Sequence, residues 1–446
     1  MGNDPESTEP RFSAEVYQNE YLPAGGSEVN AIVTVTCRGG TGGPRASART
    51  RGGRGGPGAA VVIMVDCSGS MEYPPTKMRH ARDATAAAIG TLRDGVAFAV
   101  VSGTHRASEV YPGGGRLAVA DTVARAQAVQ ALSGLSAGGG TAIGTWLRLA
   151  DRLLSSSEAA IRHGILLTDG RNEHEAPETL RAALEACAGR FTCDARGVGT
   201  DWEVGEVTGI AAALLGSADI VADPAGLAAD FARMMETAMG KEVADVNLRL
   251  WTPAGAEVAF VKQVAPTVEN LTDRRADAGA RAGDYPTGSW GDESRDYHVC
   301  VRVPPAEVGR EMLAARVSVV VPPPGGGTPE TRAQGLVRAV WTGDLAASTS
   351  FNPQVAHYTG QAELAQAIQQ GLEARKSGDR DAATAKLGRA VHLAHASGNE
   401  ETAKLLAKVV DVVDVATGTV RLKRDVAEAD EMTLETRSTK TVRVKK

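Results

Sequence analysis

The sequence predicts three folded parts: a doubly wound α/β domain inserted into an antiparallel β-sandwich, and a helical domain that follows them. Between residues 59 and 240, apolar strands alternate with Ala- and Leu-rich helical stretches, which is typical of a parallel sheet covered on both faces. On either side of this region the apolar residues recur with a period of two, as they do in half-buried strands. After residue 360 they recur at helical spacing, in segments that each end in glycine.

The N-terminal strands of the sandwich are predicted at residues 11–37, where Val29, Ala31, Val33 and Val35 alternate along one face. Residues 38–58 follow, with five arginines, three Arg-Gly-Gly triplets and no apolar period, and they predict a flexible linker. RNA binding by this linker is the weaker interpretation, because it has no aromatic side chains to stack on bases.

The α/β domain is predicted over residues 59–240, with strands at 59–65, 96–101, 163–168 and 191–198. Residues 243–342 return to strands joined by Gly/Pro turns and, with 11–37, form the predicted sandwich. Within them, 272–293 is interpreted as a long loop.

The C-terminal region is predicted to hold three packed helices over 360–417, followed by a basic, Thr-rich tail over 418–446. The tail ends in RSTKTVRVKK, which has five basic and no acidic residues, and such a tail is expected to be disordered or docked on a partner. Four tail threonines near arginines are candidate kinase substrates: Thr433, Thr436, Thr439 and Thr441.

Composition and charge narrow the class of protein. The 446-residue chain has a net charge of -6, which argues against nucleic-acid binding as its main role. It has no secretory signal pattern at its start and no window of 18 apolar residues that could span a membrane. Its five cysteines are scattered and odd in number, as expected for reduced thiols, so we expect a cytoplasmic protein.

The candidate site lies where the predicted parallel strands end. Asp66 follows the first strand in DCSGSM, with Ser68 and Ser70 two and four residues later. Asp169 ends another strand in GILLTDG, and Thr141 follows the glycines of SAGGGT. Ligands of doubly wound sheets bind at this edge, so these side chains are expected on one rim. Carboxylate and hydroxyl oxygens suit Mg²⁺, which retains open or water-filled positions that a carboxylate from another molecule could take.

At these residues the sequence resembles a von Willebrand factor type A (VWA) domain, a Rossmann-like fold, with an intact metal-ion-dependent adhesion site (MIDAS). The family pattern is D-x-S-x-S, then Thr, then Asp. The resemblance implies that Asp66, Ser68, Ser70, Thr141 and Asp169 hold the metal, with both serines and often the threonine coordinating directly. It implies Mg²⁺, with Mn²⁺ or Ca²⁺ as alternatives. The flanking sandwich is similar to bacterial relatives of calcium-activated chloride channel and inter-alpha-trypsin-inhibitor-like proteins.

Enzymatic alternatives are weaker. A haloacid-dehalogenase-type phosphatase needs a second acid two residues after Asp66, where this chain has Ser68. A subtilase would need a Gly-Thr-Ser nucleophile segment, which this sequence lacks. The sequence also lacks the phosphate-binding G-x-x-x-x-G-K-[ST] loop, which argues against an ATPase. A metal-dependent hydrolase would have only Glu173 and His174 as candidate bases.

The function that the sequence predicts is therefore a non-catalytic, metal-dependent interaction module whose Mg²⁺ takes a Glu or Asp of a partner protein. The Ala-, Arg- and Gly-rich composition suggests a GC-rich bacterial genome. The resemblance then implies a scaffold for a stress-response or signalling assembly, with kinase, phosphatase or phosphothreonine-reading proteins as candidate partners. A nucleic-acid-associated scaffold using residues 38–58 and the tail is the alternative; it predicts binding that weakens with salt and survives chelation.

Overall fold

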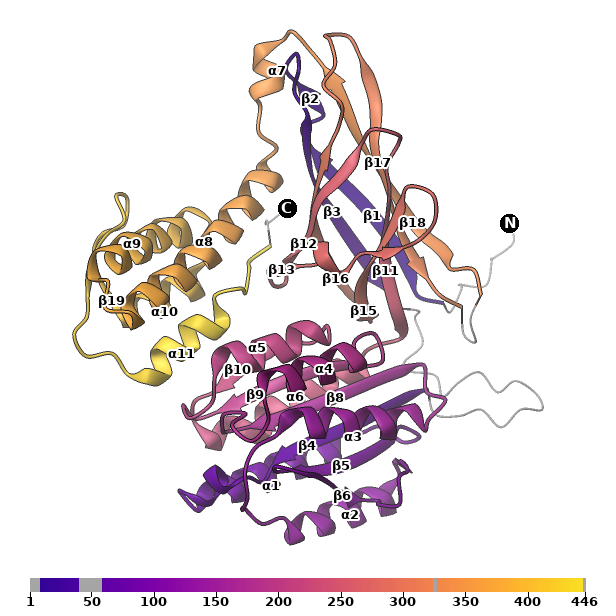
Figure 1. Ribbon diagram of the computed structural model, residues 1–446, viewed down its shortest axis with the longest axis vertical. Helices are drawn as coiled ribbons and strands as arrows, with labels where there is room; N and C mark the ends of the chain where they lie inside the picture. The colour runs from indigo at the N-terminus through magenta and orange to yellow at the C-terminus, as the bar shows by residue number, and fades with distance from the viewer. Residues whose placement is uncertain (1–8, 40–57, 324–326, 444–446) are drawn as a thin grey trace, which may run out of the picture. The chain divides into compact units, whose positions relative to one another are not determined.

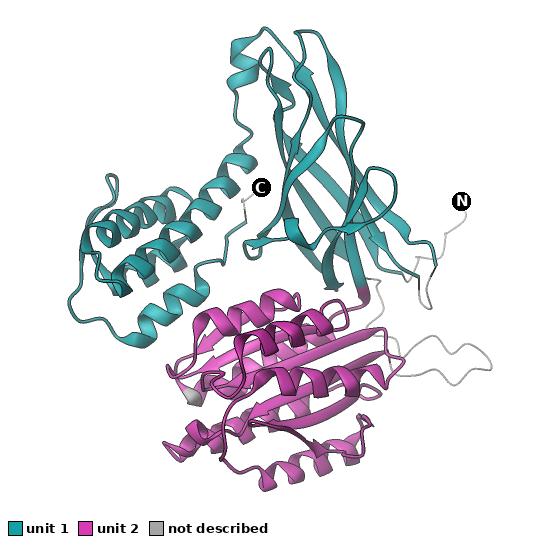
Figure 2. Cartoon of the chain, viewed as in Figure 1, with its two compact units in different colours: residues 1–40, 245–446 teal, residues 41–244 magenta. Residues whose placement is uncertain are grey.

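The computed structural model describes residues 9–39, 58–323 and 327–443. The chain divides into two compact units (Figure 2): residues 41–244, called the α/β unit, and residues 1–40 with 245–446, called the sandwich unit. One unit is thus inserted in the sequence of the other, as predicted. Nearly all of the predicted linker at 38–58 lies outside the described residues.

The α/β unit is built on a seven-stranded sheet of order β10-β9-β8-β4-β5-β6, with β7 also paired to β5. Five strands are parallel: β4 (Ala59–Asp66), β5 (Ala97–Gly103), β8 (Ile161–Thr168), β9 (Thr192–Val198) and β10 (Ala218–Val221). The two antiparallel strands are β6 (Ala107–Tyr111) and β7 (Ala118–Val119). β6, β7 and β10 were not predicted from the sequence, because they are too short to show a period.

Six helices flank this sheet (Figure 1): α1 (Thr76–Thr91), α2 (Thr122–Ala131), α3 (Ile143–Ser155), α4 (Pro177–Cys187), α5 (Val204–Ala213) and α6 (Leu227–Met239). Short 3₁₀ turns lie at η1 (Gly69–Glu72), η2 (Leu132–Gly134) and η3 (Pro224–Gly226). Every second residue of β4, such as Ile63, packs in one core with Met78 of α1 and Phe231 of α6. β4 is buried on both faces, which explains its continuous apolar run.

The sandwich unit contains two sheets. The five-stranded sheet has the order β1-β3-β16-β12-β13, with β1 (Arg11–Gln18), β3 (Glu28–Arg38), β12 (Glu257–Ala265), β13 (Glu269–Asn270) and β16 (Glu293–Arg302). The six-stranded sheet has the order β14-β15-β11-β17-β18-β2, with β2 (Tyr21–Leu22), β11 (Val243–Trp251), β14 (Ala276–Asp277), β15 (Ala282–Trp290), β17 (Glu311–Val321) and β18 (Glu330–Trp341). The sheets meet where Phe12 of β1 packs edge-on against Trp290 of β15, with ring centroids 5.7 Å apart. The N-terminal strands complete the sandwich, as predicted.

One predicted loop of this unit is largely strand. Residues 272–293 contain a 3₁₀ turn, η4 (Thr272–Arg274), followed by β14 and β15. The interpretation as a loop was wrong because the Gly, Pro and Asp residues of β15 resemble turn signals, whereas seven of its nine residues are buried between neighbours.

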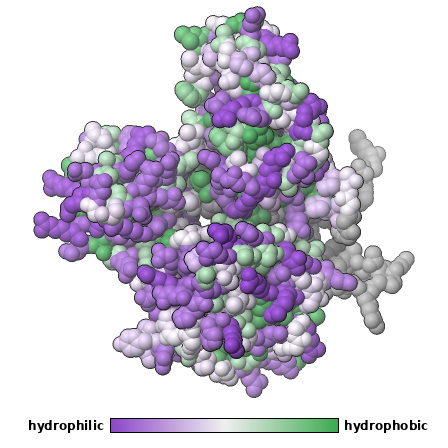
Figure 3. Space-filling model, in the orientation of Figure 1, coloured by the Kyte–Doolittle hydropathy of each residue, from purple (hydrophilic) through white to green (hydrophobic). Residues whose placement is uncertain are grey.

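The C-terminal part is helical, with α7 (Leu345–Thr349), α8 (Pro353–Lys376), α9 (Arg380–Ala396), α10 (Glu400–Val409) and α11 (Glu428–Arg437). Residues of α8 to α11 share an apolar core that includes Ile368, Leu387, Leu406 and Leu434. Figure 3 shows hydrophilic side chains over most of the visible face of these helices. In the part of the chain that the structure describes, no helix is long and apolar enough to cross a membrane.

Two details differ from the sequence prediction. The third predicted helix ends at Val409, and the valine-rich run after it forms a hairpin of β19 (Val410–Asp414) and β20 (Thr419–Leu422). β-Branched residues favour strands over helices, which explains the break. The predicted tail holds β20 and α11, and α11 buries Met432 and Leu434 while its acidic first turn suits the positive end of the helix dipole.

Residues after α11 dock on the five-stranded sheet, at the turn between β12 and β13. The backbone N–H of Val268 donates to the carbonyl of Thr439 at 2.8 Å, and the N–H of Thr441 donates to the carbonyl of Pro266 at 3.0 Å. The Thr441 hydroxyl also donates to the carbonyl of Val264 at 2.6 Å. We call residues 439–443 the C-terminal strap.

The strap ends in an ionic contact between a partly exposed arginine and a buried carboxylate. Arg443 donates twice to the carboxylate of Asp296 on β16, at 2.9 and 2.7 Å. The hydroxyls of Tyr358 on α8 and Thr34 on β3 donate to the same carboxylate, at 2.5 and 2.6 Å. Asp296 is only 3% exposed, and these donors compensate its charge in place of water.

Candidate metal centre

The two aspartates of the site meet at the switch point of the sheet. β4 lies between β8 and β5 and pairs in parallel with both. The chain leaves β4 toward β5 and leaves β8 toward β9, so the two connections run in opposite directions from the gap between β4 and β8. The register sets Val65 opposite Leu167, which brings Asp66 beside Thr168 and Asp169. Asp66 Oδ2 accepts the hydroxyl of Thr168 at 2.6 Å and the backbone N–H of Asp169 at 3.4 Å. Thr168 was not among the predicted site residues, although it directly precedes Asp169.

Two serine hydroxyls bridge the aspartates. Ser68 donates both its backbone N–H (2.8 Å) and its hydroxyl (2.6 Å) to Asp66 Oδ1. The Ser70 hydroxyl donates to Asp169 Oδ1 at 2.7 Å, and the oxygens of Ser68 and Ser70 are 2.9 Å apart. The four side chains therefore form one continuous chain of oxygens. Asp66, Ser68 and Asp169 are buried, and Ser70 is half-buried.

Thr141 is carried to this site by a glycine-rich loop. The loop is fixed to the DCSGS turn by two backbone bonds of 2.8 Å, from Gly69 N–H to the Gly139 carbonyl and from Gly138 N–H to the Cys67 carbonyl. A Cβ placed on Gly170 would lie 2.9 Å from Ser70 Oγ and 3.5 Å from Thr141 Oγ1. Gly170 thus leaves open the space that both hydroxyls face, and Thr141 joins the other four predicted residues.

Residues 172–175 hold Thr141 in place by capping the start of α3. Asn172 Oδ1 accepts the N–H of Ile143 at 2.7 Å, and Glu175 Oε1 accepts the N–H of Gly144 at 2.6 Å. Thr141 exchanges bonds with His174: its N–H donates to His174 Nδ1 at 3.1 Å, and its carbonyl accepts the His174 N–H at 2.9 Å. These contacts bind the loop after β8 to the loop before α3, and so fix Thr141 relative to Asp169.

The electrostatics of the site are set by burial. Burial away from water raises the pKa of Asp66 to about 6, hydrogen bonds from Ser68 and Thr168 oppose the rise, and the nearby Asp169 carboxylate adds to it. Lys77 of α1 supplies a positive charge, with Nζ 2.7 Å from Asp169 Oδ2. Nothing in the sequence indicated this lysine, because a lysine in the first turn of a helix usually faces solvent.

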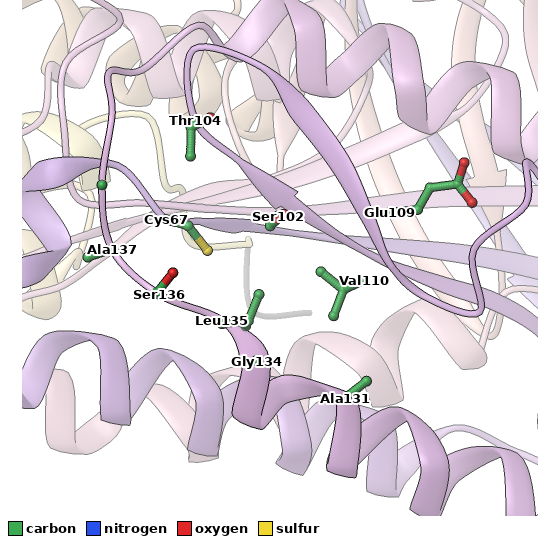
Figure 4. Close-up of a pocket in the computed structure, with 11 residues that line it drawn as sticks. Cys67, Ser102, Thr104, Glu109, Val110, Ala131, Gly134, Leu135, Ser136 and Ala137 are labelled. Carbon is green, nitrogen blue, oxygen red and sulfur yellow. The ribbon is translucent and has the colours of Figure 1, made fainter.

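Cys67, between the ligand residues, lies outside the oxygen chain. Its side chain lines a pocket of about 440 Å³ together with Ser102, Thr104 and Leu135 (Figure 4). Burial, and next the charge of Asp66, raise the pKa of its thiol to about 12. The thiol is therefore protonated at neutral pH and is a poor nucleophile.

The oxygen atoms of the site are suitable ligands for a hard divalent cation. All five predicted residues offer oxygen, and because the serine protons point to the carboxylates, lone pairs of both hydroxyls remain for a metal. Within the described ranges, no three His, Cys, Asp or Glu side chains cluster in a way that could hold a metal. The predicted site therefore depends on its serine and threonine hydroxyls as well as on its two carboxylates.

The fold and the site define a class: a doubly wound α/β domain with an all-oxygen site at the switch point of its sheet. The family model for the von Willebrand factor type A domain matches residues 59–220, and the model for the von Willebrand factor type A C-terminal domain matches residues 392–438. A solved structure described as von Willebrand factor type A from Catenulispora acidiphila is 49% identical, with a TM-score of 0.91 and 99% of each chain covered. The chain belongs to the von Willebrand factor type A family, which confirms the predicted family and the predicted fold class.

More distant structures are also similar. The ArnB paralog VWA2 from Sulfolobus acidocaldarius matches 97% of this chain and 98% of its own, at 14% identity and a TM-score of 0.57, which shows a shared fold. Proximal thread matrix protein 1 from the mussel byssus, in a structure described with a zinc-occupied MIDAS motif, matches 41% of this chain and 46% of its own. That match has 23% identity and a TM-score of 0.35. No curated protein matches the chain.

Proposed function

We propose that the α/β unit is a non-catalytic interaction module that binds Mg²⁺ through Asp66, Ser68, Ser70, Thr141 and Asp169. The observation that carries this proposal is the pair of serine oxygens 2.9 Å apart, whose protons are directed at Asp66 and Asp169. Neighbouring ligands of an octahedral Mg²⁺ at 2.0–2.1 Å are about 2.9 Å apart, whereas those of Ca²⁺ at 2.3–2.6 Å are about 3.3–3.7 Å apart if set at right angles. Mg²⁺ or Mn²⁺ would therefore fit with the two serines where they are, whereas Ca²⁺ would require their oxygens to move apart.

The bound cation would act as a Lewis acid that accepts a carboxylate oxygen of a partner protein. The chain's own residues hold the cation and orient its open side: the aspartates fix the serine hydroxyls, and residues 172–175 fix Thr141. Because the aspartates are buried, a partner residue reaches the metal and not the carboxylates. We therefore expect the partner's contact residue to be Glu or Asp, which carries the charge that the cation attracts.

Binding without catalysis is supported by the groups around the site. The Cys67 thiol is protonated, since its pKa is raised to about 12 by burial. His174, one of the two candidate bases, uses Nδ1 to accept the backbone N–H of Thr141 and so serves to position that residue. Glu173, the other candidate, is exposed to solvent.

For the cellular role, we propose a cytoplasmic scaffold of a signalling or stress-response assembly. The five cysteines all lie in described parts of the chain, where each is a buried thiol, which suits a reducing compartment. Two of the candidate phosphorylation sites are held within the fold: Thr436 is 4% exposed, and the Thr441 hydroxyl donates to a backbone carbonyl. Phosphorylation of Thr436 would therefore require α11 to detach first, and phosphorylation of Thr441 would require the C-terminal strap to detach.

Two measurements test the metal-dependent mechanism. Titration calorimetry of Mg²⁺ and Mn²⁺ should show one site in the full chain, abolished by Asp66→Asn and retained in Asp83→Asn, which removes an exposed charge on α1. A pull-down with the full chain as bait should then recover a partner with Mg²⁺ and lose it with chelator or with Asp66→Asn. Equal recovery under every condition would contradict the proposal. Melting curves show whether each variant is folded.

A further inference from the structure

Lys77 places a positive charge inside the oxygen site. It belongs to the first turn of α1, and its side chain is 9% exposed. Its Nζ donates to Asp169 Oδ2 at 2.7 Å, to Asp201 Oδ2 at 3.1 Å and to the backbone carbonyl of Ser70 at 3.4 Å. A lysine this deeply buried must be paired, and here one of its partners is a predicted metal ligand.

The bonds to Asp169 are divided between two donors. Ser70 takes Oδ1 and Lys77 takes Oδ2, so both oxygens of a fully buried carboxylate are engaged without any metal. The two buried aspartates carry two negative charges if both are ionised, and Lys77 offsets one of them. Its other carboxylate partner, Asp201, has a side chain that is 68% exposed, so solvent screens that second pair.

We infer that Lys77 is a built-in counter-cation of the site, an inference that rests on the proposed function. It holds Asp169 in place when no divalent ion is bound. When the ion binds, the fixed ammonium repels it and lowers the affinity of the site, because both positive charges act on the same carboxylate. The loaded site then carries more positive charge than two aspartates and a divalent ion would give alone, which favours a negatively charged partner residue as the last ligand.

A purely structural ion pair makes a different prediction. If Lys77 only anchored α1, removing its charge would lower stability equally with and without metal, and the metal affinity would not rise. If Lys77 is a counter-cation, removing its charge should lower the stability in chelator and also tighten metal binding. The metal should then stabilise the variant more than it stabilises the wild type. The sign of the change in metal affinity therefore decides between the two.

The test uses the full chain with Lys77→Met, which keeps the length of the side chain and removes its charge. Arg79→Met is the matched control, since it makes the same charge change at an exposed position of the same helix. We expect the Kd for Mn²⁺, measured by calorimetry, to fall at least about tenfold in Lys77→Met and to stay within about twofold in Arg79→Met. The difference in melting temperature between Mn²⁺ and chelator should also widen in Lys77→Met alone.

An unchanged or higher Kd in Lys77→Met would overturn the inference while leaving the proposed function intact. Wild-type protein that binds no Mn²⁺ would overturn both. If Lys77→Met folds only when Mn²⁺ is present, that result supports the inference, because the metal then replaces the missing charge. If it does not fold at all, Lys77→Gln, which keeps a hydrogen-bond donor for Asp169 without the charge, takes its place in the same titration with the same criterion.

Discussion

The contact between Arg443 and Asp296 gives a sharp test of how the C-terminal strap is held. Arg443→Met keeps most of the side-chain volume and removes both hydrogen bonds to the carboxylate. Removing one partner of a fully buried ion pair costs about 3–5 kcal/mol, because the other charge stays uncompensated. The Arg443 side chain is 43% exposed, and Tyr358 and Thr34 still donate to Asp296, so we expect about 2 kcal/mol.

Hydrogen exchange measures this loss at the strap itself. The amides of Val268 and Thr441 are bonded across the strap, so their exchange requires it to open. A loss of about 2 kcal/mol corresponds to roughly thirtyfold faster exchange at these amides. Mass spectrometry of peptides covering 264–270 and 438–443 would detect the change, with peptides of α9 as an internal reference.

Arg424→Met is the matched control, because Arg424 is an arginine of the same C-terminal region that lies outside the strap. It should leave exchange at the strap within about twofold of wild type, as surface charge changes usually do. If Arg443→Met also stays within about twofold, the ion pair does not hold the strap, and the magnitude derived from the burial of Asp296 is wrong.

Three further predictions concern stability. Burial lowers the pKa of His298 from 6.5 to about 4, and the charge of Lys262 on β12 adds to the shift. Below pH 6.5 the unfolded state therefore binds a proton that the folded state does not. Unfolding in urea should therefore show a loss of about 2 kcal/mol between neutral pH and about pH 5, and the loss should be smaller in His298→Gln. Gly103→Ala would put a Cβ 2.3 Å from the Trp146 ring and should lower the free energy of unfolding by at least about 1–3 kcal/mol, as measured by thermal melts. Gly90→Ala is the control, because a Cβ there meets nothing within 4 Å, and it should be neutral or stabilising. Asn172→Ala removes the acceptor for Ile143 N–H and should lower the free energy of unfolding by about 0.5–2 kcal/mol. It should also weaken Mn²⁺ binding, because Thr141 is then held less firmly. An unchanged Kd for Mn²⁺ in calorimetry would contradict that role.

The sequence allowed the α/β core and the five candidate ligands to be located because their signals are local or topological. Apolar runs mark the central strands, and a parallel sheet carries the residues that follow those strands to one edge. Asp66 and Asp169 could be paired in this way, although 102 residues separate Asp66 from Thr168, which donates to it.

Other parts depend on contacts that no local pattern shows. Lys77 is recognisable as part of the site only once α1 is packed against the sheet, because its spacing alone is that of a surface lysine. β15 was missed since its Gly, Asp and Pro residues resemble turn signals, and its burial depends on the rest of the fold and not on its own hydrophobicity. The hairpin after α10 was missed because the valines continue the helical apolar pattern while their branched side chains favour a strand.

The insertion of one unit into the other sets the order in which the protein can fold during synthesis. β3 is bonded to β1 on one side and to β16 on the other, and β16 begins 255 residues after β3 ends. If the ribosome adds about 5–20 residues per second, roughly 13–50 s pass between the synthesis of β3 and that of β16. During this time the two-stranded β1–β3 ribbon is only marginally stable. The α/β unit is continuous in sequence and can fold within that interval. A nascent chain would thus carry a finished α/β unit while its first strands still need protection from aggregation.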